Sequence, residues 1–178
     1  MKIKMKIVVL AGGISTERDV SLISSAGILK ALREKGHQVI LLDVFLGYKK
    51  RGEDVSNIFE KAAEMDSQVN DIQSVDPDIE QVKKMRDGDE KGLFGPNVIE
   101  ICRQADIVYM GLHGADGENG KVQAAFDVLG IKYTGSDYLG SALAMDKGMA
   151  KKVFLQSKIP TPNGFTMTKS HIHELTKE

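Results

Sequence analysis

The chain has 178 residues, of which 42% are hydrophobic and 28% are charged, enough for one folded core or for one domain with part of another. Its 24 basic and 25 acidic residues give a formal net charge of −1, so no charge excess favours binding to nucleic acid or an anionic membrane. We therefore expect small-molecule partners. The sequence has one cysteine, Cys102, and it shows neither an apolar run of membrane-spanning length nor a leader-like segment. These features predict a protein of the reducing cytoplasm.

The first elements follow the pattern of a parallel α/β sheet. Residues 6–10, KIVVL, are an apolar, β-branched run followed by Ala-Gly-Gly, which predicts a buried strand. From Val20 to Leu32 apolar residues keep helical spacing, and Gly36 is a natural stop. Residues 37–44, HQVILLDV, predict a second strand. Strand, helix and strand in this order predict a right-handed βαβ unit with a parallel strand pair.

The segment from Leu46 to Pro96 is charged and polar without a clear period. We interpret it as an insertion, with one or two surface helices around residues 58–65 and 79–85 and mobile loops beside them.

Further elements are expected after this segment. They are a strand over residues 107–112, a helix over 121–129, a short fourth strand over 131–135, a helical tract over 138–157 with a break near Asp146, and an extended, proline-marked connection over 159–167 that leads into another strand. The whole predicts a three-layer, open parallel, Rossmann-like sheet over residues 1–145. Residues 146–178 are expected to begin a second domain.

Two glycine-containing loops follow predicted strands, at the edge where ligands bind open parallel sheets. In the first, Gly12 and Gly13 permit close backbone approach, and the next helix directs free amide groups towards a ligand. Its sequence AGGIST lacks the GxGxxG spacing of dinucleotide-binding proteins. Asp43, at the end of the second strand, could bind a ribose, but an acid is common there by chance. A dinucleotide binder is therefore disfavoured.

The second loop, LHGADGENGKVQAAF from Leu112, is too rich in glycine and polar residues for a mere turn. Its glycines recur every third residue and alternate with polar side chains: Gly114, Gly117 and Gly120 with His113, Asp116, Glu118 and Asn119. This density predicts a loop that wraps around a ligand, and Glu118 and Asn119 are expected to brace it through backbone amides.

Three stretches resemble the D-alanine:D-alanine ligases of the ATP-grasp superfamily: GGISTERDVSL, HGADGENGKVQ, and YTGSDYLGSALAMDK followed by KIPTP. Their order and spacing match, over residues 5–46 and 93–167, although Asn119 stands where aspartate is more usual. The resemblance implies the pre-ATP-grasp, substrate-binding N-terminal part of an ATP-dependent ligase of peptidoglycan precursor synthesis.

The resemblance also implies roles for individual residues. Glu17 would bind the ammonium group of the first D-alanine through a charge-assisted hydrogen bond, and otherwise would only complement a helix N-terminus. His113, with Gly114, would lie near the substrate carboxylate, or would be a structural imidazole that ties down the turn. Val20 and Ser21 are candidates to line the first substrate subsite, although Val20 could equally be core.

Lys147 would contact ATP phosphates, according to the same resemblance. In the family mechanism that the resemblance implies, magnesium-bound ATP phosphorylates the carboxylate of the first D-alanine. The amine of the second D-alanine then attacks the acyl phosphate. The metal-binding acids and the nucleotide clamp would lie beyond Glu178, so we expect no metal ligand and no tight ATP or Mg²⁺ binding in this chain, which alone should be inactive. A homodimer is expected. The alternative is a non-catalytic domain for amino-acid binding or dimerisation.

Overall fold

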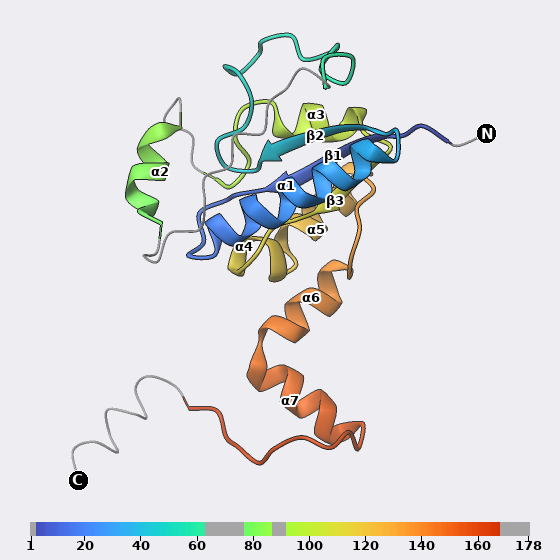
Figure 1. The fold of residues 1–178 in the computed structure, drawn as a ribbon. Coiled ribbons are helices and arrows are strands. Elements are labelled where there is room, and N and C mark those ends of the chain that lie inside the picture. Colours follow the sequence, from blue (N-terminus) through green and yellow to red (C-terminus); the bar gives the residue numbers. More distant parts are fainter. Residues whose placement is uncertain (1–2, 63–76, 87–91, 168–178) are drawn as a thin grey trace.

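The computed structural model describes residues 3–62, 77–86 and 92–167, and its strands form one parallel sheet (Figure 1). Within these residues the sheet has the order β2-β1-β3, with β1 (Lys6–Ala11) between β2 (Gln38–Asp43) and β3 (Ile107–Met110). Lys6 pairs with Gln38 in one register, and Ile7 pairs with Ile107 in the other. The predicted βαβ unit and open parallel sheet are confirmed.

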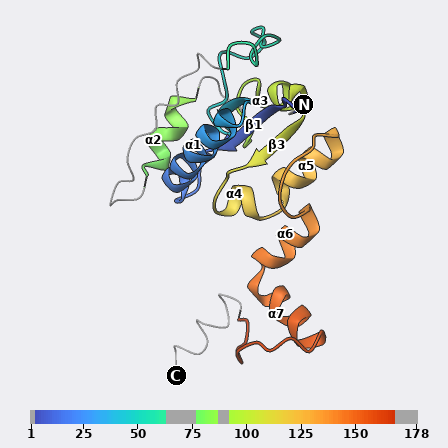
Figure 2. The ribbon, with the colours of Figure 1, turned by 45° about the vertical axis from the view of Figure 1, so that its right-hand side comes forward.

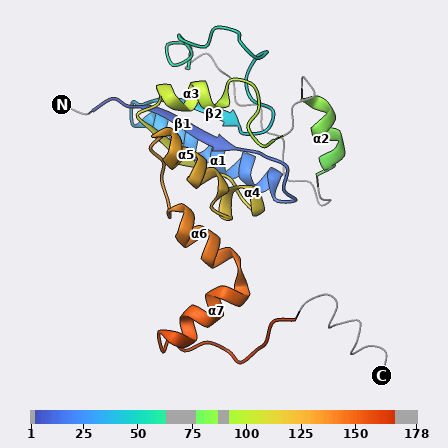
Figure 3. The ribbon, with the colours of Figure 1, turned by 180° about the vertical axis from the view of Figure 1, so that it is seen from behind.

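Helices cover both faces of this sheet, so the architecture has three layers. The helices are α1 (Arg18–Glu34), α2 (Ile79–Met85), α3 (Val98–Gln104), α4 (Ala115–Glu118), α5 (Lys121–Leu129), α6 (Tyr138–Met145) and α7 (Lys147–Gln156). Alternate residues of β1 face opposite sides: Val9 packs in a cluster with Leu29 of α1. Val8 packs in the larger cluster with residues of α3 and α5, including Phe126. Figures 1 and 3 show α1 on one face of the sheet and α3 and α5 on the other.

The short strand expected at residues 131–135 is reduced to a single bridge. Val108 of β3 pairs with Tyr133 in parallel, and its N–H donates to the Lys132 carbonyl at 2.8 Å. Glycines with positive φ, Gly130 at 67° and Gly135 at 101°, flank this segment. Because they turn the backbone on both sides, the segment is too short to continue the sheet, and the prediction of a fourth strand was wrong.

The segment from Leu46 to Pro96 contributes to the core more than its composition indicated. The helix predicted at 79–85 is confirmed, whereas residues 58–62 form turns, so that the described part of the predicted 58–65 helix was wrong. Phe59 is only 2% exposed, and Val82 of α2 is also buried, both in the same cluster as Val8. A few well-placed apolar residues thus anchor a largely charged segment, which periodicity does not reveal.

The last two helices project away from the sheet (Figures 1 and 2). They meet at Asp146, as expected: its backbone N–H donates to the Ala142 carbonyl and ends α6, while its carboxylate accepts the Met149 N–H at 3.0 Å and caps α7. Neither helix contains a buried residue. Residues 159–167 have no regular secondary structure, the strand expected after them lies outside the described residues, and the boundary at 145/146 stays a prediction. In the part of the chain that is described, no helix could span a membrane.

Candidate substrate-binding site

The loop between β1 and α1 presents Glu17 at the carboxyl edge of the sheet. Gly12 and Gly13 turn the backbone with φ values of +74° and +87°, and α1 then begins at Arg18, two residues before the predicted start. Glu17 occupies the N-cap position, but its side chain makes no capping hydrogen bond and is exposed. Its carboxylate therefore does not serve as a cap, although it lies close to the positive end of the helix dipole.

The loop after β3 lies directly against this first loop. The Ser15 hydroxyl donates to the His113 carbonyl at 2.8 Å, and the Ser24 hydroxyl of α1 lies 3.3 Å from His113 Nε2. Gly114 has a φ of +77°, and a Cβ atom built on it would lie 2.8 Å from Glu17 Oε2. The fold thus brings together three of the predicted site residues from two loops far apart in the sequence.

The remaining residues of the predicted subsite divide between surface and interior. Val20 is 40% exposed, so it is not part of the core. Ser21 is fully buried, and its hydroxyl accepts the Gly12 N–H at 3.0 Å and donates to the Gly111 carbonyl at 2.6 Å. Ser21 therefore links the ends of β1 and β3 behind the two loops.

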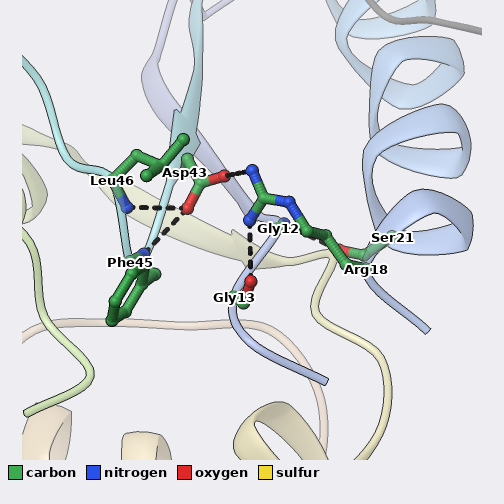
Figure 4. A network of polar contacts seen from close by, with 7 residues as sticks. All are labelled: Gly12, Gly13, Arg18, Ser21, Asp43, Phe45 and Leu46. Carbon is green, nitrogen blue, oxygen red and sulfur yellow. Dashed lines mark hydrogen bonds and ion pairs between the residues drawn. The ribbon is translucent and has the colours of Figure 1, made fainter. Parts of the chain in front are cut away.

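An ion pair that the sequence did not reveal lies under the first loop (Figure 4). Arg18 Nη2 lies 2.5 Å from Asp43 Oδ2, and Arg18 Nη1 donates to the Gly13 carbonyl at 2.7 Å. Asp43 Oδ1 accepts the N–H groups of Phe45 and Leu46 at 2.8 and 2.9 Å. Both carboxylate oxygens are thus engaged inside the protein, which argues against Asp43 as a ribose ligand. The only sequence signals were an arginine after Glu17 and an acid at the end of a strand.

The second loop is braced by side chains that reach its backbone. Buried Gln123 donates from Nε2 to the Gly117 carbonyl at 2.7 Å, a contact that sequence reasoning missed although this glutamine belongs to the quoted motif. Asn119 Oδ1 accepts the Lys121 N–H at 3.1 Å, as predicted. Glu118 is exposed instead, and lines a neighbouring cavity.

Lys147 lines this cavity, which has a volume of about 550 Å³ and lies between β3, the second loop and α6. Lys147 is the only cationic side chain in its described lining, which also includes Glu118, Thr134, Ser136 and Ser141. Its ammonium lies 3.4 Å from the Ala144 carbonyl and is exposed. Glu17 and His113 do not line this cavity, so the structure separates the predicted phosphate contact from the predicted amino-acid contacts.

Other polar groups of the described residues bear on reactivity. Cys102 is buried in α3, and burial, reinforced by the nearby Glu100 charge, raises the pKa of its thiol to about 12. In the described ranges, no group of three or more His, Cys, Asp or Glu side chains could hold a metal ion.

The chain is an α/β domain with an open parallel sheet, and it presents a carboxylate and an imidazole on adjoining loops at the carboxyl edge, where such sheets bind ligands. Residues 6–136 match the family model described as D-ala D-ala ligase N-terminus, and the chain belongs to this family. The family resemblance noted in the sequence is therefore confirmed.

Curated relatives are named D-alanine–D-alanine ligase. The protein from Lacticaseibacillus casei (strain BL23) is 51% identical over 162 residues, 90% of this chain and 44% of the relative. That from Pediococcus pentosaceus is 47% identical over 159 residues, 88% of this chain and 44% of the relative. The chain thus spans less than half the length of these relatives.

Solved structures of D-alanine–D-alanine ligase from Bacillus anthracis share the fold. The one complexed with ATP has a TM-score of 0.56 and 23% identity, covering 89% of this chain and 39% of that one. A second has a TM-score of 0.57 and 24% identity, covering 97% of this chain and 42% of that one.

Proposed function

We propose that this chain is the substrate-binding N-terminal part of an ATP-dependent D-alanine:D-alanine ligase of peptidoglycan precursor synthesis. The observation that carries the proposal is the convergence of Glu17 with His113 and Gly114 at the carboxyl edge of the sheet. Family membership and the names of the relatives support the reaction class.

Glu17 is the proposed ligand of the ammonium group of the first D-alanine. Its carboxylate is exposed, makes no capping bond and lies beside Gly114, where a Cβ atom would come within 2.8 Å of Oε2. A carboxylate and an ammonium form a charge-assisted hydrogen bond, roughly twice as strong as a neutral one. Val20, partly exposed two residues after the helix begins, is a candidate to contact the substrate methyl group, whereas Ser21 acts from behind by holding the loops.

His113 is the proposed neighbour of the substrate carboxylate. The contact of its ring with Ser24 and that of its carbonyl with Ser15 hold the imidazole in place. These contacts serve both roles considered for this histidine, because an imidazole that ties down the loop is also held ready for a ligand. Gly114 completes this subsite, because the absence of a side chain lets its backbone lie close to the Glu17 carboxylate.

Lys147 is the proposed contact for ATP phosphate. An exposed ammonium at a cavity lined by hydroxyl groups suits an anionic group, which supports this role. ATP, when bound, would supply the phosphoryl group that activates the D-alanine carboxylate. The described residues offer no cluster that fits Mg²⁺, so we assign no metal ligand to them.

A homodimer and a cytoplasmic location belong to the same proposal. Half-exposed apolar side chains on α6 and α7, such as Leu139 at 54% and Leu155 at 58%, support an interface. Sedimentation of the purified chain would test the dimer.

A hybrid protein would test the function. The chain replaces the matching part of the Lacticaseibacillus casei relative, and D-alanine-dependent phosphate release from ATP is measured. Glu17→Gln should lower kcat/KM, with a loss of transition-state stabilisation of about 2 to 4 kcal/mol, because the substrate ammonium would lose its charged partner. Glu80→Gln, which breaks the exposed pair with Lys83 on α2, is the matched control and should change nothing. An active hybrid in which Glu17→Gln leaves kcat/KM unchanged would contradict the role of Glu17.

A further inference from the structure

The Arg18–Asp43 pair joins three parts of the chain at one guanidinium. Arg18 is the first residue of α1, Asp43 is the last residue of β2, and Gly13 belongs to the first loop (Figure 4). The side chains are 8% and 13% exposed, so the pair is largely shielded from water. Arginine presents its donors in a rigid fork, which allows one side chain to hold a carboxylate and a carbonyl at once.

The pair closes the first loop at both of its ends. One branch of the guanidinium holds the carbonyl at Gly13, and the backbone of the same arginine ends the loop immediately after Glu17. Asp43 is in turn fixed by two backbone N–H groups, of Phe45 and Leu46. A Cβ atom on Gly12 would collide with the Asp43 carboxylate, so the loop lies directly on the pair.

The Arg18–Asp43 pair restricts the position of Glu17. Adjacent Cα atoms are separated by a fixed distance across a trans peptide, so holding Arg18 restricts where Glu17 can lie. Few contacts of its own hold the Glu17 side chain: it is exposed and uncapped, and its backbone N–H donates to Ser15 Oγ at 3.3 Å.

From these contacts we infer that Arg18 and Asp43 are positioning residues, which hold the 13–17 loop so that the Glu17 carboxylate lies beside Gly114. Neither residue contacts the ligand. This inference rests on the proposed function for its consequence, the binding of the substrate ammonium, but the placement of Glu17 can be measured without any ligand.

The first arm of the test measures that placement in the 178-residue chain. Nuclear Overhauser contacts between the Glu17 side-chain protons and the Gly114 Hα protons should be present in the wild type. They should be lost in Asp43→Asn, which keeps an acceptor for the two backbone N–H groups but removes the charge. Arg18→Lys, which keeps the charge but not the fork, should weaken them.

The double variant Arg18→Met with Asp43→Asn controls for loss of the Glu17–Gly114 contacts through unfolding. It removes both charges together, so no unpaired buried charge remains to destabilise the protein. A folded double variant that lacks the Glu17–Gly114 contacts separates positioning from stability. Glu80→Gln, in the exposed pair of α2, is the control and should keep these contacts.

The second arm measures ligand preference by titrating the same proteins with D-alanine and with propionate, which lacks the ammonium group. The wild type should bind D-alanine more tightly than propionate. In the Asp43→Asn and double variants the ratio of these two affinities should fall about tenfold, which is the effect of one charge-assisted hydrogen bond. Propionate affinity should change little. A merely structural pair would not alter this ratio in a folded protein.

The outcomes are distinguishable. Folded variants that keep both the Glu17–Gly114 contacts and the preference for D-alanine would overturn the inference. Loss of the contacts in the variants, together with a wild type that binds D-alanine no better than propionate, would uphold the positioning role and count against the proposed function.

Discussion

Glu17 and Gly114 lie against each other although 96 residues separate them in the sequence: a Cβ atom on Gly114 would lie 2.8 Å from Glu17 Oε2 and 3.0 Å from Ser15 Oγ. Gly114 also has a φ of +77°, where side chains are strained. The first substrate subsite therefore depends on the absence of a side chain at this position.

Gly114→Ala should destabilise the chain by about 1 to 3 kcal/mol and displace Glu17, because a methyl group there is both strained and crowded. Urea unfolding measures the stability, and D-alanine titration measures the effect on binding. Gly27→Ala is the matched control. Gly27 lies exposed within α1 with nothing near its Cβ position, so this change should stabilise the chain by about 0.5 to 1 kcal/mol. Equal effects of both substitutions would refute the crowding at Gly114.

Phe59→Ala should reduce the free energy of unfolding by about 3 to 5 kcal/mol, because it empties a large buried site. Phe59 is 2% exposed although it lies in the charge-rich segment after β2. Phe165→Ala removes the same side chain from a position that is 86% exposed and should have little effect on stability. Urea unfolding of both variants compares them. A mild effect of Phe59→Ala would indicate that this segment is not part of the core.

Cys102 should react slowly with Ellman's reagent in the native chain at pH 8 and rapidly in urea, because burial keeps the thiol protonated. Its folded pKa of about 12 exceeds the ordinary value of 9.0. The contribution of this thiol to stability is therefore fully present below pH 9 and is lost as the pH rises towards 12, since the unfolded thiol ionises first. Cys102→Ala should remove that part of the pH dependence. Rapid native labelling would show that the site opens readily.

The chain alone should not join two D-alanine molecules. Phosphoryl transfer needs several charged groups held around the phosphates, and Lys147 is the only cation in the described lining of its cavity. Phosphate release from ATP is measured with and without D-alanine, after thorough removal of the host ligase. The Lys147→Ala variant is the matched control for any residual rate. D-alanine-dependent release by the wild type that Lys147→Ala abolishes would contradict this prediction.

Local sequence determined the elements whose signals are continuous along the chain. The apolar runs in β1 and β2 predicted two strands because both faces of a parallel sheet are buried. The 121–129 helix and the break at Asp146 also agreed, since glycines flank the former and an aspartate cap marks the latter. The motifs placed Glu17 and His113 in loops at strand ends, which indicated a shared edge.

Tertiary structure decided what depends on contacts between distant segments. Residues 131–135 pair with β3 only at Tyr133. Phe59 is buried because it packs into the same cluster as Val8 of β1, and a local period encodes neither feature. Arg18 and Asp43 each resemble an ordinary surface charge in sequence. Their pairing under the first loop arises because β2 lies beside β1 in parallel, which brings the end of one strand next to the start of the helix that follows the other. The sequence supplied the groups of the site, and the sheet order decided which of them meet.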